Sequence, residues 1–90
     1  MKAVQMHYVG RVQGVGFRYA TRRLAQEYDV SGSVRNLPDG RVELVVAGDS
    51  DEVEAFLSAV RDSSLAGHIQ REVRSVISLD TPLKGFQIVP

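Results

Sequence analysis

The first third of the chain changes from an alternating to a helical pattern of apolar residues. Val4, Met6 and Tyr8 fall at every second position of segment 3–12, which is the period of a half-buried strand. After a glycine-rich stretch, apolar residues recur at three- and four-residue spacing, which is typical of an amphipathic helix. These residues are Phe17, Ala20, Leu24 and Tyr28. The pattern therefore predicts a strand that leads through a glycine loop into a helix starting near Phe17.

The middle of the chain predicts a hairpin and a second helix. Segment 31–37 is short and β-compatible, and Leu37-Pro38-Asp39-Gly40 suits a type I turn closed by a left-handed glycine. The next arm alternates, and we expect its apolar face, made of Val42, Leu44 and Val46, to meet the core. Beyond it, Asp49 and Glu52 resemble a capping box. One helical stripe then runs through Val53, Phe56, Leu57 and Val60.

The last third predicts two more strands. After a break at Ser63, Ser64 and Gly67, a single strand parity is shared by Ile69, Val73, Ile77 and Leu79. Pro82 to Gly85 separates this strand from a short end piece, 86–89. The order β-α-β-β-α-β predicts an α+β, ferredoxin-like sandwich, with an antiparallel sheet and both helices on one face. Since no repeat or linker interrupts the pattern, we expect residues 1–90 to form a single domain.

Composition excludes several classes of function. The 90 residues include no cysteine, two histidines, and 11 basic against 11 acidic side chains. Disulfides, thiolate catalysis and cysteine-ligated zinc are therefore excluded, and we expect no metal and no cofactor. The balanced charge disfavours nucleic-acid binding. No apolar run approaches the roughly 20 residues of a spanning helix and no signal-peptide core is present, which predicts a cytoplasmic protein without membrane contact.

The glycine-rich stretch, Gly10 to Arg18, is the candidate functional segment. Basic residues outnumber acidic ones up to Arg41, so positive charge gathers where the glycines are. A glycine loop before a helix can turn its N–H groups inward to hold an anion, and Arg18 adds a charged fork that fits phosphate oxygens. By itself this pattern also fits an ordinary tight turn. The spacing matches neither the dinucleotide fingerprint nor the P-loop of nucleotide-binding proteins.

Three segments together resemble the acylphosphatase family. They are Gly10-Arg11-Val12-Gln13-Gly14-Val15-Gly16-Phe17-Arg18, then Gly32-Ser33-Val34-Arg35-Asn36, then Asp39-Gly40-Arg41-Val42-Glu43. The likeness covers nearly the whole chain. It implies a ferredoxin-like enzyme that hydrolyses the carboxyl-phosphate bond of small acyl phosphates, giving a carboxylate and inorganic phosphate without a metal.

The resemblance also implies roles for individual residues. The family's catalytic arginine corresponds to Arg18, which binds phosphate, and its catalytic asparagine to Asn36, which positions the attacking water. The backbone amides that bind substrate phosphate are those of Gln13, Gly14, Val15, Gly16, Phe17 and Arg18. Inorganic phosphate, as the product, is expected to be a competitive inhibitor. A monomer is the simplest expected state.

Other residues near the motifs have simpler explanations. Solvated positions account for Arg11, Arg22, Arg23 and Arg35, and neither His7 nor His68 is given a role. Core packing accounts for Tyr8, Phe17 and Tyr28, while Tyr19 is expected to pack beside the loop. The chain departs from the family where tryptophan, proline and alanine are common; it has Ser33, His68 and Arg71. Substrate affinity or stability is expected to reflect these departures.

Two other functions fit part of the pattern. One is a non-catalytic acylphosphatase-like domain that binds an anion such as carbamoyl phosphate and acts only with a partner; the short chain favours the free-standing enzyme. The other is a regulatory ferredoxin-like module that binds an effector or RNA on its open sheet face. No basic strand pattern with exposed aromatics supports RNA binding. Such a module would bind no phosphate at Arg18.

Overall fold

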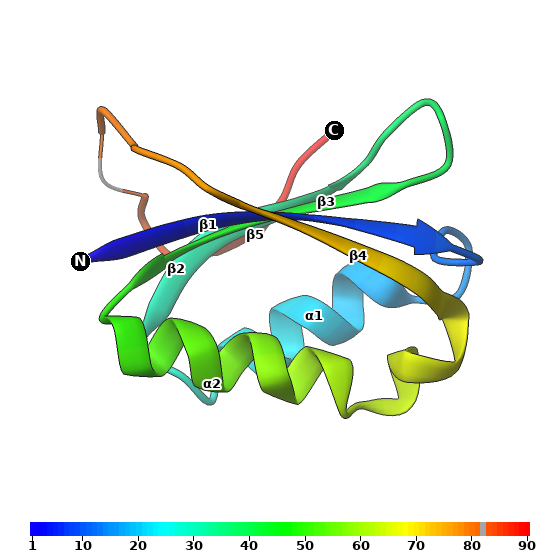
Figure 1. Ribbon diagram of the computed structural model, residues 1–90, viewed down its shortest axis with the longest axis horizontal. Helices are drawn as coiled ribbons and strands as arrows, with labels where there is room; N and C mark the ends of the chain where they lie inside the picture. The colour runs from blue at the N-terminus through cyan, green and yellow to red at the C-terminus, as the bar shows by residue number, and fades with distance from the viewer. Residues whose placement is uncertain (82) are drawn as a thin grey trace.

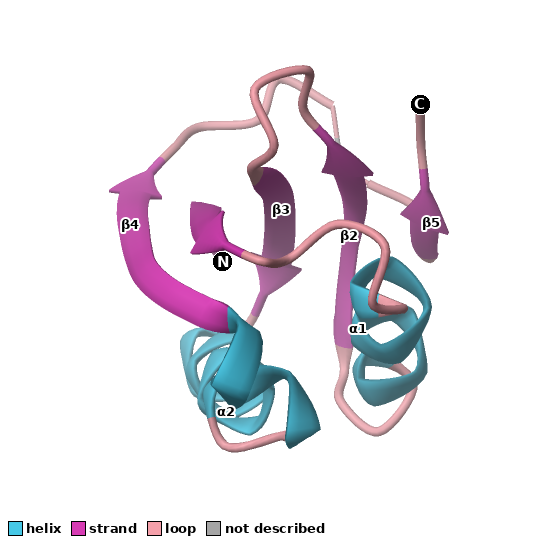
Figure 2. Ribbon diagram, turned by 90° about the vertical axis from the view of Figure 1, so that its right-hand side faces the viewer, coloured by secondary structure: helices cyan, strands magenta, loops and turns pink. Residues whose placement is uncertain are grey.

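The computed structural model describes residues 1–81 and 83–90 and has a five-stranded sheet with two helices on one face (Figure 1). In chain order, the elements are β1 (Lys2–Gly10), α1 (Phe17–Ala25), β2 (Val30–Asn36), β3 (Val42–Gly48), α2 (Ser50–Arg61), a 3₁₀ helix η1 (Ser64–His68), β4 (Ile69–Val76) and β5 (Phe86–Ile88). The strand order across the sheet is β4-β1-β3-β2-β5, and Figure 2 shows the sheet from its end, with α1 and α2 together on one side. The predicted ferredoxin-like order is therefore confirmed.

The sheet is antiparallel in four of its strands and parallel in the fifth. β1 pairs antiparallel with both β3 and β4, and β2 pairs antiparallel with β3. The short β5 lies parallel to β2, with Gly32 opposite Phe86 and Val34 opposite Ile88. The sequence predicted the end piece but not its direction, because three residues carry too little pattern to choose a neighbour.

The core lies between the sheet and the helices, as the alternation predicts. Val4 faces Val46 across the β1–β3 pair, Met6 faces Leu44 and Tyr8 faces Val42. All six side chains are at most 3% exposed. The predicted stripe of α2 covers them and is also buried: Val53, Phe56, Leu57 and Val60. Burying an aliphatic side chain of this size contributes roughly 1.5–3 kcal/mol, so this layer is a large part of what holds the fold together.

Helix α1 starts where predicted but ends earlier. Gly16 is its N-cap, with φ +78°, and Phe17 is its first residue. The helix stops at Ala25, and Tyr28 lies in the following turn, where its ring still contacts that of Phe56 at a centroid distance of 6.0 Å. The predicted spacing was therefore right for the packing of Tyr28 and wrong for its secondary structure.

The predicted capping box at the start of α2 is wrong. Asp49 is the N-cap, but its side chain makes no capping hydrogen bond. The carboxylate of Glu52 accepts instead from the backbone N–H of Asp29, at 2.7 Å. The side chain that would close the box thus joins α2 to the turn after α1, a partner that sequence spacing does not reveal.

The predicted hairpin turn is confirmed, whereas the fourth strand is shorter than expected. Leu37 and Arg41 close the turn through an N–H to carbonyl bond of 2.8 Å, and Gly40 has φ +97°. β4 ends at Val76, so Ile77 and Leu79 lie beyond it. The predicted break between α2 and β4 contains the short helix η1. Ser63 caps this helix, because its side chain accepts a hydrogen bond from the N–H of Leu65. Pro82 lies outside the described residues.

A network of charges joins α2 to two strands. Glu54 of α2 binds Lys2 of β1 at 2.8 Å and forms a two-pronged pair with Arg74 of β4, one bond of which is 2.9 Å. These hydrogen bonds, chiefly the one from Arg74, lower the pKa of Glu54 from 4.5 to about 2. The charges are largely exposed, so water and salt weaken the pairs.

Among the described residues, no helix is long and apolar enough to cross a membrane.

Glu54→Gln is expected to lower Tm at pH 7 by about 1–5 °C, since exposed ion pairs contribute little. A carboxyl group with a lowered folded-state pKa stabilises the fold above its unfolded pKa and loses that effect as pH falls through the folded value. The Tm difference between native protein and variant should therefore shrink from pH 4.5 to about pH 2. Thermal unfolding followed by circular dichroism measures it. Glu27→Gln, at an exposed position, is the control and should show no such trend.

Candidate active site

The loop of residues 11–16 joins the end of β1 to the start of α1 (Figure 1). Gly14 and Gly16 have φ values of +79° and +78°, in the left-handed region that strains residues with side chains. Among the described residues other than the two chain neighbours, no atom lies within 4 Å of the place that a Cβ would occupy at either glycine. Backbone conformation, rather than lack of space, therefore accounts for both. The loop presents its peptide groups beside the first turn of α1, whose N–H groups lack helical partners.

A cavity of about 220 Å³ opens between this loop, the start of α1 and the end of β2. Arg18 lies in the first turn of α1, and Asn36 is the last residue of β2. The fold therefore brings these two predicted site residues, 18 positions apart in the chain, to one cavity. Its lining residues are Val12, Gly14, Gly16, Phe17, Arg18, Tyr19 and Asn36.

Asn36 reaches the cavity because of the strand period. Side chains alternate across a strand, so Asn36 shares the helix-facing side of β2 with the buried Val34, while Arg35 points the other way. The buried Oδ1 of Asn36 has no hydrogen-bond partner among the described residues. A buried polar atom of this kind is costly unless something binds it. The amide is thus available to a small polar molecule in the cavity.

The charge of Arg18 is free for an anion. Among the described residues, its half-buried side chain forms no ion pair, and no acidic side chain lines the cavity. The arginines of the neighbouring hairpin differ, because Arg35 pairs with Glu43 at 3.0 Å and Arg41 with Asp39 at 2.8 Å. Arg18 therefore combines an open fork of N–H donors with the positive end of a helix.

Two of the predicted substrate-binding residues lie apart from the cavity lining. The side chain of Gln13 donates to the carbonyl oxygens of Leu37 and Arg41 in the hairpin. Val15, at the outside of the loop, is 38% exposed. The structure places the other four predicted residues, Gly14, Gly16, Phe17 and Arg18, on the lining. The use of all six backbone amides in phosphate binding stays a prediction.

Hydrophobic residues form the remaining walls. Phe17 is buried and stacks obliquely on Tyr8, with ring centroids 5.1 Å apart, which fixes the start of α1 to β1. Tyr19 stands beside the loop as expected, but it is 59% exposed and the guanidinium of Arg22 lies 5.4 Å from its ring centroid. Sequence reasoning gave neither Tyr19 nor Val12 a part in the site. An exposed aromatic residue directly after Arg18 was the available signal.

Another polar group lies on the opposite face of the sheet. His7 and Glu43 are cross-strand partners, with Nε2 and Oε2 3.1 Å apart, so His7 has a partner that sequence spacing did not suggest. Partial burial opposes ionisation of Glu43, but hydrogen bonds from Arg35 and His7 hold its pKa below the usual value. This row braces the hairpin from the side that faces away from the helices.

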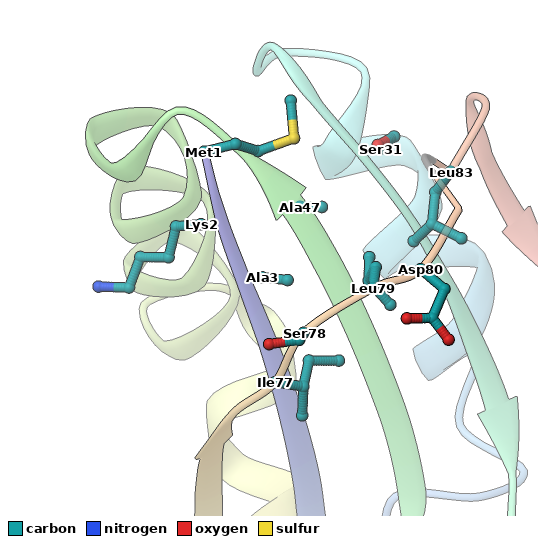
Figure 3. A pocket seen from close by; sticks show the side chains of 10 residues that line it. All are labelled: Met1, Lys2, Ala3, Ser31, Ala47, Ile77, Ser78, Leu79, Asp80 and Leu83. Carbon is teal, nitrogen blue, oxygen red and sulfur yellow. The ribbon is translucent and has the colours of Figure 1, made fainter.

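A larger hollow, of about 410 Å³, lies at the other end of β1 (Figure 3). The small side chains of Ala3, Ala47 and Ser31 form its floor, since they are neighbours across three strands. Leu79 and Leu83, from the segment after β4, lie over them. Its lysine, Lys2, points away and is paired with Glu54. Of the two hollows, the smaller cavity at Arg18 is therefore the one whose lining has a basic side chain free to bind an anion.

No group of three potential metal-binding side chains occurs among the described residues.

Comparison with known proteins gives consistent results. The sequence model of the acylphosphatase family matches residues 4–88. An acylphosphatase of Lactobacillus johnsonii is 39% identical over 90 residues, covering 99% of both chains. The crystal structure of acylphosphatase from Bacillus subtilis superposes with a TM-score of 0.88 and 33% identity, covering 100% of both chains. The crystal structure of HypF from T. kodakarensis is also similar, with a TM-score of 0.87 and 33% identity over all of this chain but 12% of that one.

Proposed function

The chain belongs to the acylphosphatase family and is an acylphosphatase, and we propose that its active site is the cavity that Arg18 shares with Asn36. The substrate is an acyl phosphate and phosphate is a product. One observation carries the proposal: an arginine beside a helix N-terminus lines the same cavity as an asparagine. Among residues 1–81 and 83–90, the arginine has no ion-pair partner and the buried Oδ1 of the asparagine has no hydrogen-bond partner. The loop and α1 supply the first group and β2 supplies the second.

In this proposal, the phosphoryl group of the substrate binds at the glycine loop. Arg18 donates two hydrogen bonds to phosphoryl oxygens, while N–H groups of the loop and the first turn of α1 contact the others. Phosphoryl transfer passes through a loose transition state, so positioning and charge stabilisation supply most of the rate. These donors are held in place before substrate binds, which is where such stabilisation is strongest.

Asn36 orients the attacking water in this scheme. Its Oδ1 accepts a hydrogen bond from the water, whose oxygen attacks phosphorus while the bond from phosphorus to the acyl oxygen breaks. The water's proton passes to a phosphoryl oxygen. The leaving carboxylate is a weak base, so it leaves without a general acid. The products are a carboxylate and inorganic phosphate, and Arg18 supplies the positive charge that a metal would otherwise provide.

Steady-state hydrolysis of benzoyl phosphate tests this proposal. We expect turnover well above the rate in buffer, unchanged by a chelator. Inorganic phosphate is expected to raise KM and leave kcat unaltered, because it occupies the same loop as the substrate's phosphoryl group. Inhibition that lowers kcat without changing KM would contradict binding of phosphate at Arg18. Loss of turnover with chelator would contradict the metal-free scheme.

Tyr19 is placed to contact the acyl group, since it lines the cavity and more than half of its surface is exposed. Tyr19→Ala is expected to raise KM for benzoyl phosphate by about 3- to 10-fold, the range of one aromatic contact. KM for acetyl phosphate, which has no ring to stack, should change less than about 2-fold. Tyr19→Phe is the matched control and should keep the native ratio. Equal effects on both substrates would exclude acyl selection by Tyr19.

A second function is favoured by the similarity to HypF, in which a domain like this one makes up 12% of the chain. Here the domain would bind a carbamoyl phosphate-like anion and act with a partner. Calorimetric phosphate binding without benzoyl phosphate turnover would favour this alternative.

We expect the protein to be a monomer, to be cytoplasmic and not to bind nucleic acid. Light scattering after size exclusion tests the expected monomer.

A further inference from the structure

The side chain of Gln13 ties the glycine loop to the hairpin. Its Nε2 donates to the carbonyl oxygen of Leu37 at 2.8 Å and to that of Arg41 at 2.9 Å. A side-chain amide has two N–H donors, so both are used here. Leu37 follows Asn36 directly, and the two carbonyls belong to residues 24 and 28 positions from Gln13. The bonds therefore join the loop to the point where β2 presents Asn36.

The hairpin does not need these bonds to close. The carbonyl of Leu37 also accepts the N–H of Gly40 at 3.1 Å, and that of Arg41 accepts the N–H of Leu37 at 2.8 Å. A carbonyl oxygen has two lone pairs, so Gln13 occupies the second one of each. Removing Gln13's amide would leave both carbonyls with a backbone partner. What the two bonds fix is the place of the loop relative to the hairpin.

The loop has few other attachments. Val12 is buried in the core beside Gln13, and Gly14 and Gly16, both at positive φ, follow. Within 1–81 and 83–90, the bonds from Gln13 are the hydrogen bonds that connect residues 11–15 to another part of the fold. Glycine-rich backbone has many accessible conformations, so such an attachment restricts it strongly.

We propose that Gln13 is a positioning residue: its side-chain amide sets the separation between the phosphate held by the loop and the water held by Asn36. The proposal rests on the roles proposed for the loop and for Asn36. In-line attack requires the water oxygen, phosphorus and leaving oxygen to align, and a misplacement of about 1 Å can cost about 10²-fold in rate. The side chain of Gln13, bonded to the hairpin, acts by placing the loop relative to Asn36 and touches no reacting atom.

A double-mutant cycle in kcat tests this inference. Gln13→Leu keeps much of the bulk of the side chain and removes the donors, and it is expected to lower kcat for benzoyl phosphate by about 10- to 100-fold. KM and the inhibition constant for phosphate should change less than about 3-fold, because Arg18 and the first turn of α1 still bind phosphate. In the Asn36→Ala protein, the same substitution should lower kcat less than about 3-fold, since there is no longer a water to position.

Gln13→Glu gives an independent readout. An ionised carboxylate would face two carbonyl oxygens, whereas a protonated one can donate one hydrogen bond. The ratio of kcat in this variant to native kcat should therefore rise as pH falls through about 4–5, where a glutamate protonates. If the ratio of kcat values stays constant across this pH range while circular dichroism shows both proteins folded, the positioning role of the Gln13 side chain is contradicted.

Asp39→Ala is the matched control. Asp39 accepts from the N–H and Nε of Arg41 in the same turn and, in the described part of the chain, makes no hydrogen bond to the loop. Its effect on kcat should be the same with Asn36 and with Ala at that position. If Gln13→Leu lowered kcat by the same factor in the native and Asn36→Ala proteins, or raised the phosphate inhibition constant as much as it lowered kcat, the positioning role of Gln13 alone would be overturned. Native kcat in Asn36→Ala would overturn the role of Asn36 and the positioning role of Gln13 with it.

Discussion

Arg18→Ala is expected to lower kcat/KM for benzoyl phosphate by about 10³-fold, because hydrogen bonds to charged groups contribute about 1.5–3 kcal/mol each and this arginine offers two. The side chain is half-buried beside the N-terminus of α1 and forms no ion pair among the described residues. Phosphate, like the substrate, binds to the same fork, so its inhibition constant should rise as well. Steady-state kinetics with phosphate as inhibitor measures both quantities.

Two controls separate a specific role of Arg18 from the general charge of the helix. Arg23→Ala removes an exposed basic residue from the same helix and should change kcat/KM by less than about 3-fold at moderate salt. Arg18→Lys keeps the charge but loses the planar fork, and it should restore only part of the activity. Similar losses in Arg18→Ala and Arg23→Ala would assign the effect to the electrostatic potential of α1 and contradict a direct contact.

Asn36→Ala is expected to lower kcat by about 10²- to 10³-fold, the range for removing one preorganised polar group from an active site. KM and the inhibition constant for phosphate should stay within about 3-fold of native, because the loop and Arg18 still bind the phosphoryl group. This division between kcat and KM distinguishes orientation of water from substrate binding. The free protein should also lose little stability, since the buried Oδ1 has no partner in the described structure to lose.

Arg35→Gln is the matched control for Asn36. The two residues are neighbours on β2, but Arg35 faces away from the helices and pairs with Glu43. Replacing it should leave kcat within about 3-fold of native and slightly lower Tm, as expected for an exposed pair. A fall in kcat as large as that of Asn36→Ala would indicate that β2 as a whole, and not the Asn36 amide, determines the rate.

The strand and helix pattern could be predicted from the sequence where one face of an element is buried. Val42, Leu44 and Val46 alternate because the other face of β3 meets no helix, and Val53 to Val60 follow one stripe because α2 covers the sheet. β4 is different. Its helix-facing side carries Glu72 and Arg74, which pair with Arg61 and Glu54 of α2. The apolar residues that predicted the strand include Val73, on the other face of the sheet. Their spacing continues through Ile77 and Leu79, beyond the last residue of β4, so the end of this strand was misplaced.

The residues at the cavity could be predicted only by combining a local pattern with a resemblance. Glycines before a helix indicate an anion site, but nothing in the spacing connects them with Asn36, since pairing of β2 in the sheet brings it there. Side-chain bonds to distant backbone were beyond prediction. Glu52 binds the N–H of Asp29, and Gln13 binds the hairpin. Such partners depend on how elements lie in space and leave no mark in the local sequence.

The strand order also has a consequence for synthesis on the ribosome. The two outer strands of the sheet, β4 and β5, are the last two in the chain, while β1, β3 and β2 lie inside. A nascent chain that has emerged through α2 thus contains the glycine loop, Arg18 and Asn36, but both outer edges of its sheet are unpaired. Unpaired edges invite association with other chains. The outer strands are therefore added to the sheet last during translation. A pause before β4 is synthesised would leave both edges of the sheet unpaired for longest.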